Sequence, residues 1–121
     1  MLRPRIIPCL LIKNGGLVKT VNFREPIYVG DPINAVRIFN EKEVDELVIF
    51  DIDASVKGEA PNFKEISKFA KECRMPLCYG GGVKDVNDVL KLIDLGVEKV
   101  AISSAAIEDP DLIKTASNRV G

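Results

Sequence analysis

The pattern of apolar and polar residues along this chain changes its period several times. From Arg5 to Ile12 the apolar run is almost continuous, which is typical of a strand buried on both faces. From Pro32 to Glu43 apolar residues recur every three or four positions behind a first-turn proline, which predicts a helix. The alternation then continues: further strands are predicted at 46–51, 76–80 and 99–104, and further helices at 62–73, 83–95 and 109–120.

Four successive strand–helix units predict an α/β fold with a parallel sheet and right-handed crossovers. The units also repeat, because the apolar positions and strands of residues 1–53 recur 53 residues later in residues 54–106. Duplicated units of this kind are typical of a (β/α)₈ TIM barrel, which needs about 250 residues. Residues 1–121 are therefore predicted to be a single half-barrel of (βα)₄ type, the N-terminal half of a larger protein, ending where a fifth strand is expected.

The connection between the first strand and the first helix is unusually long. It spans residues 13–31, whereas such loops usually contain two to six residues. Residues 17–23 alternate and predict a small hairpin arm, expected to act as a lid, although a decorated surface loop is the alternative. The first and fourth strands are expected to be unpaired edges of an open sheet, so the isolated half is expected to self-associate.

A glycine run follows the third predicted strand, in the sequence Leu77-Cys-Tyr-Gly-Gly-Gly-Val83. Glycines let the backbone pass close to a ligand, and the N–H groups of a helix that opens directly behind them favour an anion. The run therefore predicts a phosphate site at the start of the 83–95 helix. A tight strand-to-helix turn without a ligand is the alternative.

Composition narrows the function further. A formal net charge of −1 gives no footprint for nucleic acid, and no apolar run is long enough to span a membrane. The three cysteines lack metal-ligand spacing and there is no histidine, so we expect reduced thiols, a cytoplasmic protein and neither a metal nor a cofactor. Without histidine, acid–base chemistry must use carboxylates or lysine.

Six separated motifs occur in the order and spacing of one known family, and together they cover essentially the whole chain. The chain resembles the cyclase subunit of imidazole glycerol phosphate synthase, a lyase of histidine biosynthesis, over about half of that family's length. The motifs lie at residues 5–10, 15–23, 30–32, 45–55, 80–82 and 99–106.

The resemblance implies a barrel subunit of a glutamine amidotransferase complex. A glutaminase partner of the class I type would dock on the bottom of the barrel and send ammonia through its centre. At the top, ammonia and a phosphorylated ribonucleotide would react. The half-barrel alone is expected to be inactive. The sister isomerase shares the barrel and a two-phosphate substrate, but it works without ammonia.

The resemblance also assigns residues at the top of the barrel. Asp51 matches an active-site carboxylate, with Asp53 of less clear role, and Lys19 matches a lysine that closes over substrate, although a solvated loop charge is the alternative for Lys19. Ser103 departs from the usual asparagine of the phosphate clamp, but its hydroxyl can still donate to phosphate. The phosphate-binding residues are Gly81, Gly82, Ser103 and Ser104.

Leu11 is the main departure from the family. It occupies the position of the catalytic aspartate, and a leucine cannot transfer a proton. A second hypothesis follows, in which the barrel is a non-cyclising ammonia conduit or activator for the amidation of a nucleotide sugar in polysaccharide biosynthesis. Cyclase-like paralogues of that kind are known.

Charged residues precede three of the predicted strands. Arg5, Glu46 and Lys99 come directly before apolar runs, and parallel strands place them at the same end. They match three of the four charges of the family's ammonia gate, and a salt-bridge cluster that merely closes the barrel floor is the alternative. Asp45 and Glu98 beside them are expected to contact the glutaminase partner.

Overall fold

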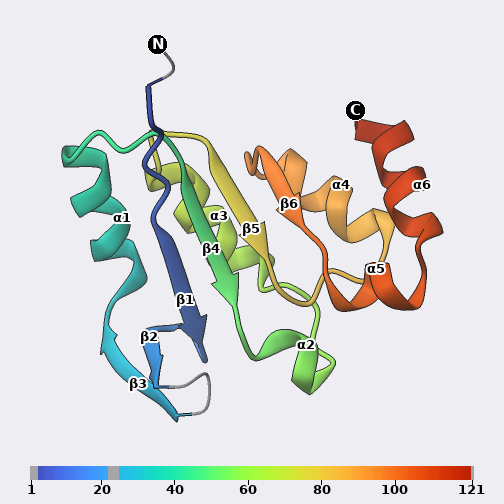
Figure 1. Ribbon diagram of the computed structural model, residues 1–121, viewed down its shortest axis with the longest axis horizontal. Coiled ribbons are helices and arrows are strands. Elements are labelled where there is room, and N and C mark those ends of the chain that lie inside the picture. The colour runs from blue at the N-terminus through green and yellow to red at the C-terminus, as the bar shows by residue number, and fades with distance from the viewer. Residues whose placement is uncertain (1–2, 22–24, 121) are drawn as a thin grey trace.

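The computed structural model describes residues 3–21 and 25–120, which form one six-stranded sheet covered by helices (Figure 1). The strand order is β3-β2-β1-β4-β5-β6, and the last four of these strands are parallel to one another. The predicted α/β half-barrel of parallel strands is confirmed. The strands are β1 (Cys9–Lys13), β2 (Gly16–Val21), β3 (Glu25–Gly30), β4 (Leu47–Asp51), β5 (Leu77–Gly80) and β6 (Lys99–Ala101). The helices are α1 (Pro32–Glu41), α2 (Ala54–Lys57), α3 (Phe63–Glu72), α4 (Val86–Asp94), α5 (Ser104–Glu108) and α6 (Asp111–Val120).

The core lies between the sheet and one layer of helices. Alternate strand residues point toward the helices and are buried, whereas the residues between them point to the opposite face, which we call the inner face. In Figure 1 the inner face is turned to the viewer, and α3 and α4 lie behind it. The buried core contains Leu10, Ile12, Leu47, Ile49, Leu77 and Tyr79 from the strands and Val36, Ile66, Phe69, Val89 and Leu92 from the helices.

Two registers cross the inner face from strand to strand. The first joins Cys9, Val48, Cys78 and Lys99, and the second joins Leu11, Phe50, Gly80 and Ala101. The second register lies nearer to the C-terminal ends of the strands. Its Phe50 ring lies across Gly80, because a Cβ on that glycine would stand 2.6 Å from Phe50 Cδ1.

The long connection forms an arm of two antiparallel strands, β2 and β3. The arm is larger than the hairpin predicted within residues 17–23, because residues 17–21 supply only one of its strands, and residues 22–23 lie outside the described part of the chain. The prediction that the first strand is an unpaired edge is wrong, because β2 pairs with β1 from Leu11 to Lys13. Asn14 and Gly15 have φ values of 51° and 78°, which suit a two-residue hairpin turn. That turn folds β2 back onto β1, and β3 becomes the edge of the sheet.

Several predicted boundaries also move. Strand pairing starts at Cys9 rather than at Arg5, and the fourth parallel strand ends at Ala101. The helix predicted at 83–95 begins at Val86, while Gly96, with φ 107°, follows its end as expected. The short helices α2 and α5 follow the second and fourth parallel strands and were not predicted, because four or five residues give no helical period.

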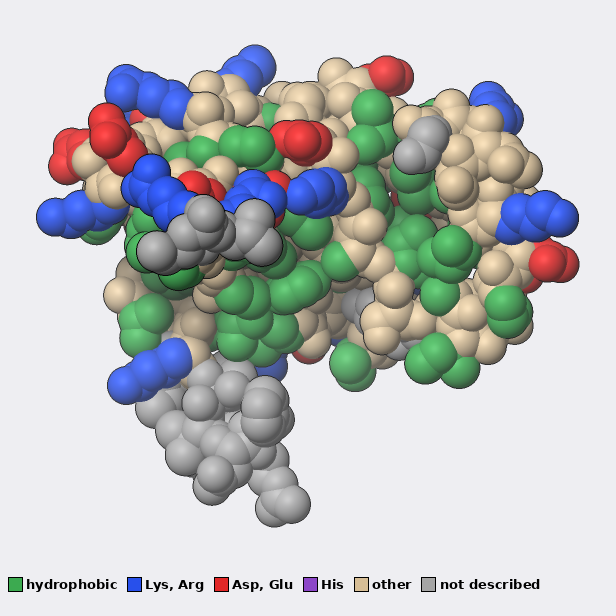
Figure 2. Space-filling view, turned by 45° about the horizontal axis from the view of Figure 1, so that its top comes forward, with side chains coloured by type: hydrophobic (Ala, Val, Ile, Leu, Met, Phe, Trp, Pro, Cys, Tyr) green, Lys and Arg blue, Asp and Glu red, His purple; other side chains and the backbone are tan. Residues whose placement is uncertain are grey.

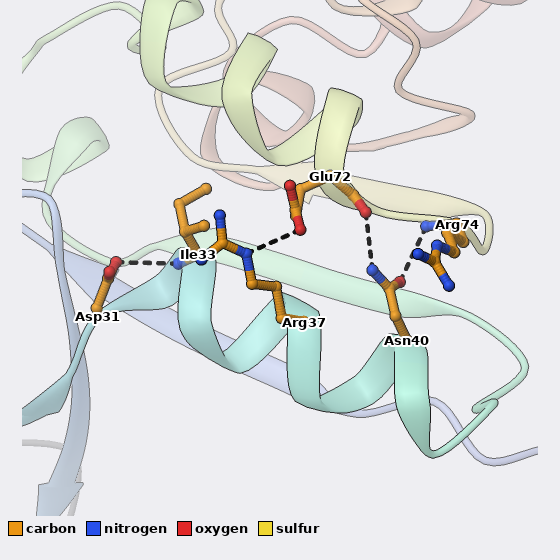
Figure 3. A network of polar contacts seen from close by, with 6 residues as sticks. All are labelled: Asp31, Ile33, Arg37, Asn40, Glu72 and Arg74. Carbon is orange, nitrogen blue, oxygen red and sulfur yellow. Dashed lines mark hydrogen bonds and ion pairs between the residues drawn. The ribbon is translucent and has the colours of Figure 1, made fainter.

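A polar network joins α1 to α3 (Figure 3). The amide of Asn40 donates to the backbone carbonyl of Glu72 at 2.8 Å and accepts from the N–H of Arg74 at 3.0 Å. One turn earlier, Arg37 pairs with the Glu72 carboxylate at 2.9 Å. Asp31 caps the first turn of α1. The network fixes the separation of the two helices that cover the first half of the sheet.

None of the helices that the structure describes is long and apolar enough to cross a lipid bilayer.

Candidate functional sites at the two strand ends

A hollow of about 310 Å³ lies at the C-terminal ends of β4, β5 and β6. Phe50 and Ala101 of the inner face border it, together with the glycine loop and Ser103. The residues around it are Phe50, Asp51, Gly80, Gly81, Gly82, Val83, Ala101, Ile102, Ser103 and Ala105. The structure thus brings Gly81, Gly82 and Ser103 together, as the sequence predicts.

The glycines of this hollow are required by close packing. Gly82 has φ 73°, and a Cβ there would stand 2.5 Å from the carbonyl oxygen of Glu59. Gly81 has φ 126°, and its Cβ would stand 2.6 Å from the carbonyl oxygen of Asp51. The buried Tyr79 hydroxyl donates to the Gly81 carbonyl at 3.0 Å, and burial raises the pKa of Tyr79 well above its ordinary value. The loop is therefore held in one conformation from beneath.

Of the two predicted serines, Ser103 borders the hollow and Ser104 is not among the residues around it. Ser103 is exposed at the N-terminal side of α5, and its hydroxyl makes no capping hydrogen bond to that helix. Ser104 is the first residue of α5. A hydroxyl that does not cap a helix can donate to a ligand oxygen.

The start of α4, where the sequence predicts a phosphate site, is capped by carboxylates of the chain itself. Its N-cap is Asp85, whose carboxylate accepts from the N–H of Asp88 at 2.9 Å. The Asp88 carboxylate in turn accepts from the N–H of Lys84 at 3.1 Å. Two carboxylates of the chain itself therefore accept from N–H groups at the start of this helix, while the glycine loop and Ser103 border the hollow beside it.

Asp51 lies at the end of β4 and is partly committed to local structure. Its Oδ1 accepts from the N–H groups of Asp53 at 3.0 Å and of Ala54 at 3.1 Å, so it starts the α2 turn. Asp51 borders the hollow of about 310 Å³ and also a second one of about 190 Å³. Asp53 forms an ion pair with Lys57 at 2.7 Å.

The arm places Lys19 on β2 opposite Ile27, with its side chain exposed. Lys19 does not border the hollow of about 310 Å³. Leu11 lies on the inner face in register with Phe50, which makes this layer apolar where the family resemblance expects an aspartate.

Sequence reasoning missed the contact that joins the arm to α2. The ammonium of Lys57 donates to the Asn14 side chain at 2.8 Å, across 43 residues. The i,i+4 spacing of Asp53 and Lys57 was the only signal in the sequence, and it pointed to a helix rather than to the arm.

At the N-terminal ends of the strands, the structure brings the three predicted charges together. Glu46 is 7% exposed and pairs with Lys99 and with Arg5, the latter at 3.2 Å. The hydrogen bond from Lys99, and then the charges of both cations, hold the pKa of Glu46 below its ordinary value although burial opposes the shift. Figure 2 turns this end forward and shows basic and acidic side chains gathered beside the apolar inner face.

The two residues expected to touch a partner lie at this same end. The Asp45 carboxylate accepts from the N–H of Ile6 at 2.6 Å and so ties the segment before β1 to the sheet. Glu98 is exposed, and its N–H donates to the carbonyl of Leu77. The described residues contain no group of three or more His, Cys, Asp or Glu side chains that could hold a metal ion.

This arrangement defines one half of a TIM-type barrel, with a candidate ligand site at one end of the strands and a charged cluster at the other. A model of the histidine biosynthesis protein family matches residues 5–121, and the chain belongs to that family.

Three relatives show how the similarity is distributed. The chain is 58% identical to the "putative imidazole glycerol phosphate synthase subunit hisF2" of Pseudomonas aeruginosa and 57% identical to the "putative imidazole glycerol phosphate synthase subunit HisF" of Leptospira borgpetersenii. It is 44% identical to the "imidazole glycerol phosphate synthase subunit HisF" of Lactococcus lactis. All of the chain is aligned in each comparison, against 48%, 48% and 47% of these proteins. The chain therefore spans about half the length of the curated relatives it matches.

Proposed function

We propose that this chain is half of the barrel subunit of a glutamine amidotransferase resembling imidazole glycerol phosphate synthase. In this proposal the barrel receives ammonia from a glutaminase partner at the N-terminal strand ends and binds a phosphorylated substrate at the C-terminal ends. The observation that carries the proposal is the presence of both features on the same parallel strands. The Glu46 cluster lies at one end, and the hollow bounded by Gly82 and Ser103 lies at the other.

The substrate end supports a phosphate ligand. The residues around it include the glycine loop and Ser103, whose hydroxyl does not cap α5, together with Asp51 at the end of β4. A volume of about 310 Å³ accommodates a phosphate group and part of a ribose. The close packing behind Gly81 and Gly82 supports the tight-turn interpretation equally, so only ligand binding separates the two.

The partner end supports an entrance for ammonia. Glu46 is buried and paired with two cations whose side chains are more than half exposed, so the cluster can exchange partners at the surface. Cys9, Val48 and Cys78 continue the inner face beyond it with apolar or weakly polar side chains. A cluster that only closes the barrel floor is the competing interpretation.

Phosphate binding is tested by titrating inorganic phosphate into isotope-labelled chain and following the backbone amide resonances. The proposal expects shifts at Gly81, Gly82 and Ser103, and a weaker affinity in Ser103→Ala. Ser117→Ala, at an exposed position of α6, is the matched control and should bind as the wild type does. Unchanged resonances around the hollow would show that the glycine run is only a turn.

A second candidate function is favoured by Leu11. In this version the barrel passes ammonia to a separate amidating enzyme and closes no ring, because its inner face carries an apolar Leu11–Phe50 pair where an acid–base group is needed. General acid–base catalysis contributes typically about 10²–10⁴-fold to such steps. The names of the relatives at 57% and 58% identity both contain the word "putative", whereas the name of the relative at 44% does not.

Free ammonia separates the two candidates, because it bypasses the glutaminase. A full-length barrel that carries this half is supplied with ammonia and the ribonucleotide substrate of the synthase. Turnover by the wild type supports a cyclase and excludes the conduit. No turnover in a barrel that still binds a glutaminase supports the conduit. The Leu11→Asp variant then shows whether the rest of the cyclase site is present, because only an intact site gains activity.

A further inference from the structure

The α2 turn lies between the arm and the glycine loop and is bonded to both. On the arm side, the Lys57 ammonium donates to Asn14 Oδ1 at 2.8 Å while it pairs with Asp53 Oδ2 at 2.7 Å. On the loop side, the Lys84 ammonium donates to the carbonyl of Gly58 at 2.7 Å. In Figure 1, α2 and the β2–β3 arm both lie beyond the C-terminal ends of the parallel strands.

Asn14 is the point at which the arm leaves the sheet. With Gly15 it forms the whole turn between β1 and β2, because Lys13 already pairs with Gly16. Asn14 holds a left-handed φ of 51°, so its backbone and side chain are fixed together at this turn. A bond to its side chain therefore constrains the direction in which the arm extends.

Lys57 is suited to hold this turn. Its partner Asp53 is 17% exposed and anchors the ammonium from the same helical turn, and Asp51 caps the first N–H groups of that turn. The anchor is therefore built on the end of β4, one of the central strands of the sheet. Lys57 does not border the hollow of about 310 Å³, so it has no contact with a ligand placed there.

We propose that Lys57 is a positioning residue that clamps the Asn14–Gly15 turn to α2 and so holds the β2–β3 arm, with Lys19, beside the phosphate site. The clamp itself is a property of the described contacts. The role assigned to the arm rests on the proposed function.

Hydrogen exchange on the intact chain tests the clamp. In Lys57→Met, the amides of β2 and β3 are expected to exchange about fivefold faster, because one hydrogen bond of ordinary net strength is lost at a partly exposed site. The amides of α6 serve as the internal reference for global stability. Lys57→Arg can still pair with Asp53 and donate to Asn14, so it should restore slow exchange, and Lys71→Met at an exposed position of α3 should leave the arm unchanged.

Arm exchange in Lys57→Met that matches the wild type, or that rises only together with exchange in α6, overturns the clamp. A failure of Lys57→Arg to restore slow exchange also overturns it. Titration with inorganic phosphate keeps the proposed function separate. If the arm loosens in Lys57→Met but phosphate does not shift Gly82 in the wild type, the clamp stands and the phosphate site fails. If phosphate binds the wild type and Lys57→Met leaves the arm unchanged, only the clamp fails.

Discussion

Gly82 combines two constraints that no other residue type satisfies. Its φ of 73° lies in the left-handed region, and the carbonyl oxygen of Glu59 occupies the space into which a side chain would project. Gly58 has a similar φ of 68°, but a Cβ there would meet only the Lys84 ammonium, at 3.9 Å. A comparison of the two glycines therefore separates the cost of the left-handed backbone from the cost of the close contact with Glu59.

Gly82→Ala is expected to be more destabilising than Gly58→Ala. The left-handed φ costs each variant on the order of 1 kcal/mol, and the contact with Glu59 adds about 1–2 kcal/mol to Gly82→Ala by displacing the loop. Urea denaturation of both variants measures the difference. Equal losses would mean that the loop moves freely and that close packing does not hold it.

The position of Leu11 in the fold was predictable from the sequence only in part. Its place in the first strand was predicted from the sequence, although the strand continues beyond it to Lys13. Its pairing with Phe50 across the inner face depends on the strand register, which follows from the assembled sheet and not from either strand alone.

Among the secondary structure elements, the caps and the long apolar stripes were predictable, and the short elements were not. Asn62 caps α3 and Pro32 opens α1 as the sequence predicts. The apolar pattern predicts that α4 begins at Val83, three residues too early. Asp85 and Asp88, which have the spacing of a capping pair, mark its true start. The Asn14–Gly15 pair is a hairpin-turn signal that did not enter the prediction, and so the pairing of the arm with β1 was missed.

The joint between α1 and α3 provides a prediction at the same scale. Asn40→Ala removes two hydrogen bonds to backbone groups at a partly buried position and should cost about 1–3 kcal/mol of unfolding free energy. Arg37→Ala removes an exposed ion pair and should cost less than about 1 kcal/mol. Thermal or urea unfolding of the two variants compares them, and a larger loss in Arg37→Ala would contradict the assignment of Asn40 as the main bond between the helices.

Over the whole molecule, the charged cluster joins residues that occupy equivalent positions in the repeat. Glu46 and Lys99 are 53 residues apart and meet at the N-terminal strand ends, together with Arg5 from the segment before β1. Parallel strand order predicts that these residues share one end. The strand predicted from Arg5 begins to pair only at Cys9, but Arg5 still reaches the cluster from the segment before it.

The cluster makes stability depend on pH. The pKa of Glu46 in the folded chain lies below its ordinary value of 4.5, mainly because Lys99 hydrogen-bonds to the carboxylate. The contribution of ionised Glu46 to the stability of the fold is therefore complete above its unfolded-state pKa. It is lost as the pH falls through the folded-state pKa. Glu46→Gln should be less stable than the wild type at neutral pH, and the difference should narrow as the solution is acidified below the ordinary value. A difference in stability that stays constant through this range would contradict a stabilising role of the ionised Glu46.

The proposed function requires the charged end of the strands to be the entrance for ammonia from a glutaminase. The most direct measurement is glutamine hydrolysis by a class I glutaminase subunit, with and without a full-length barrel that carries this half. The proposed function predicts that the barrel binds the glutaminase and accelerates glutamine hydrolysis. It also predicts that Glu46→Gln weakens this acceleration while the barrel still folds. A folded barrel that neither binds the glutaminase nor changes its rate would contradict the account.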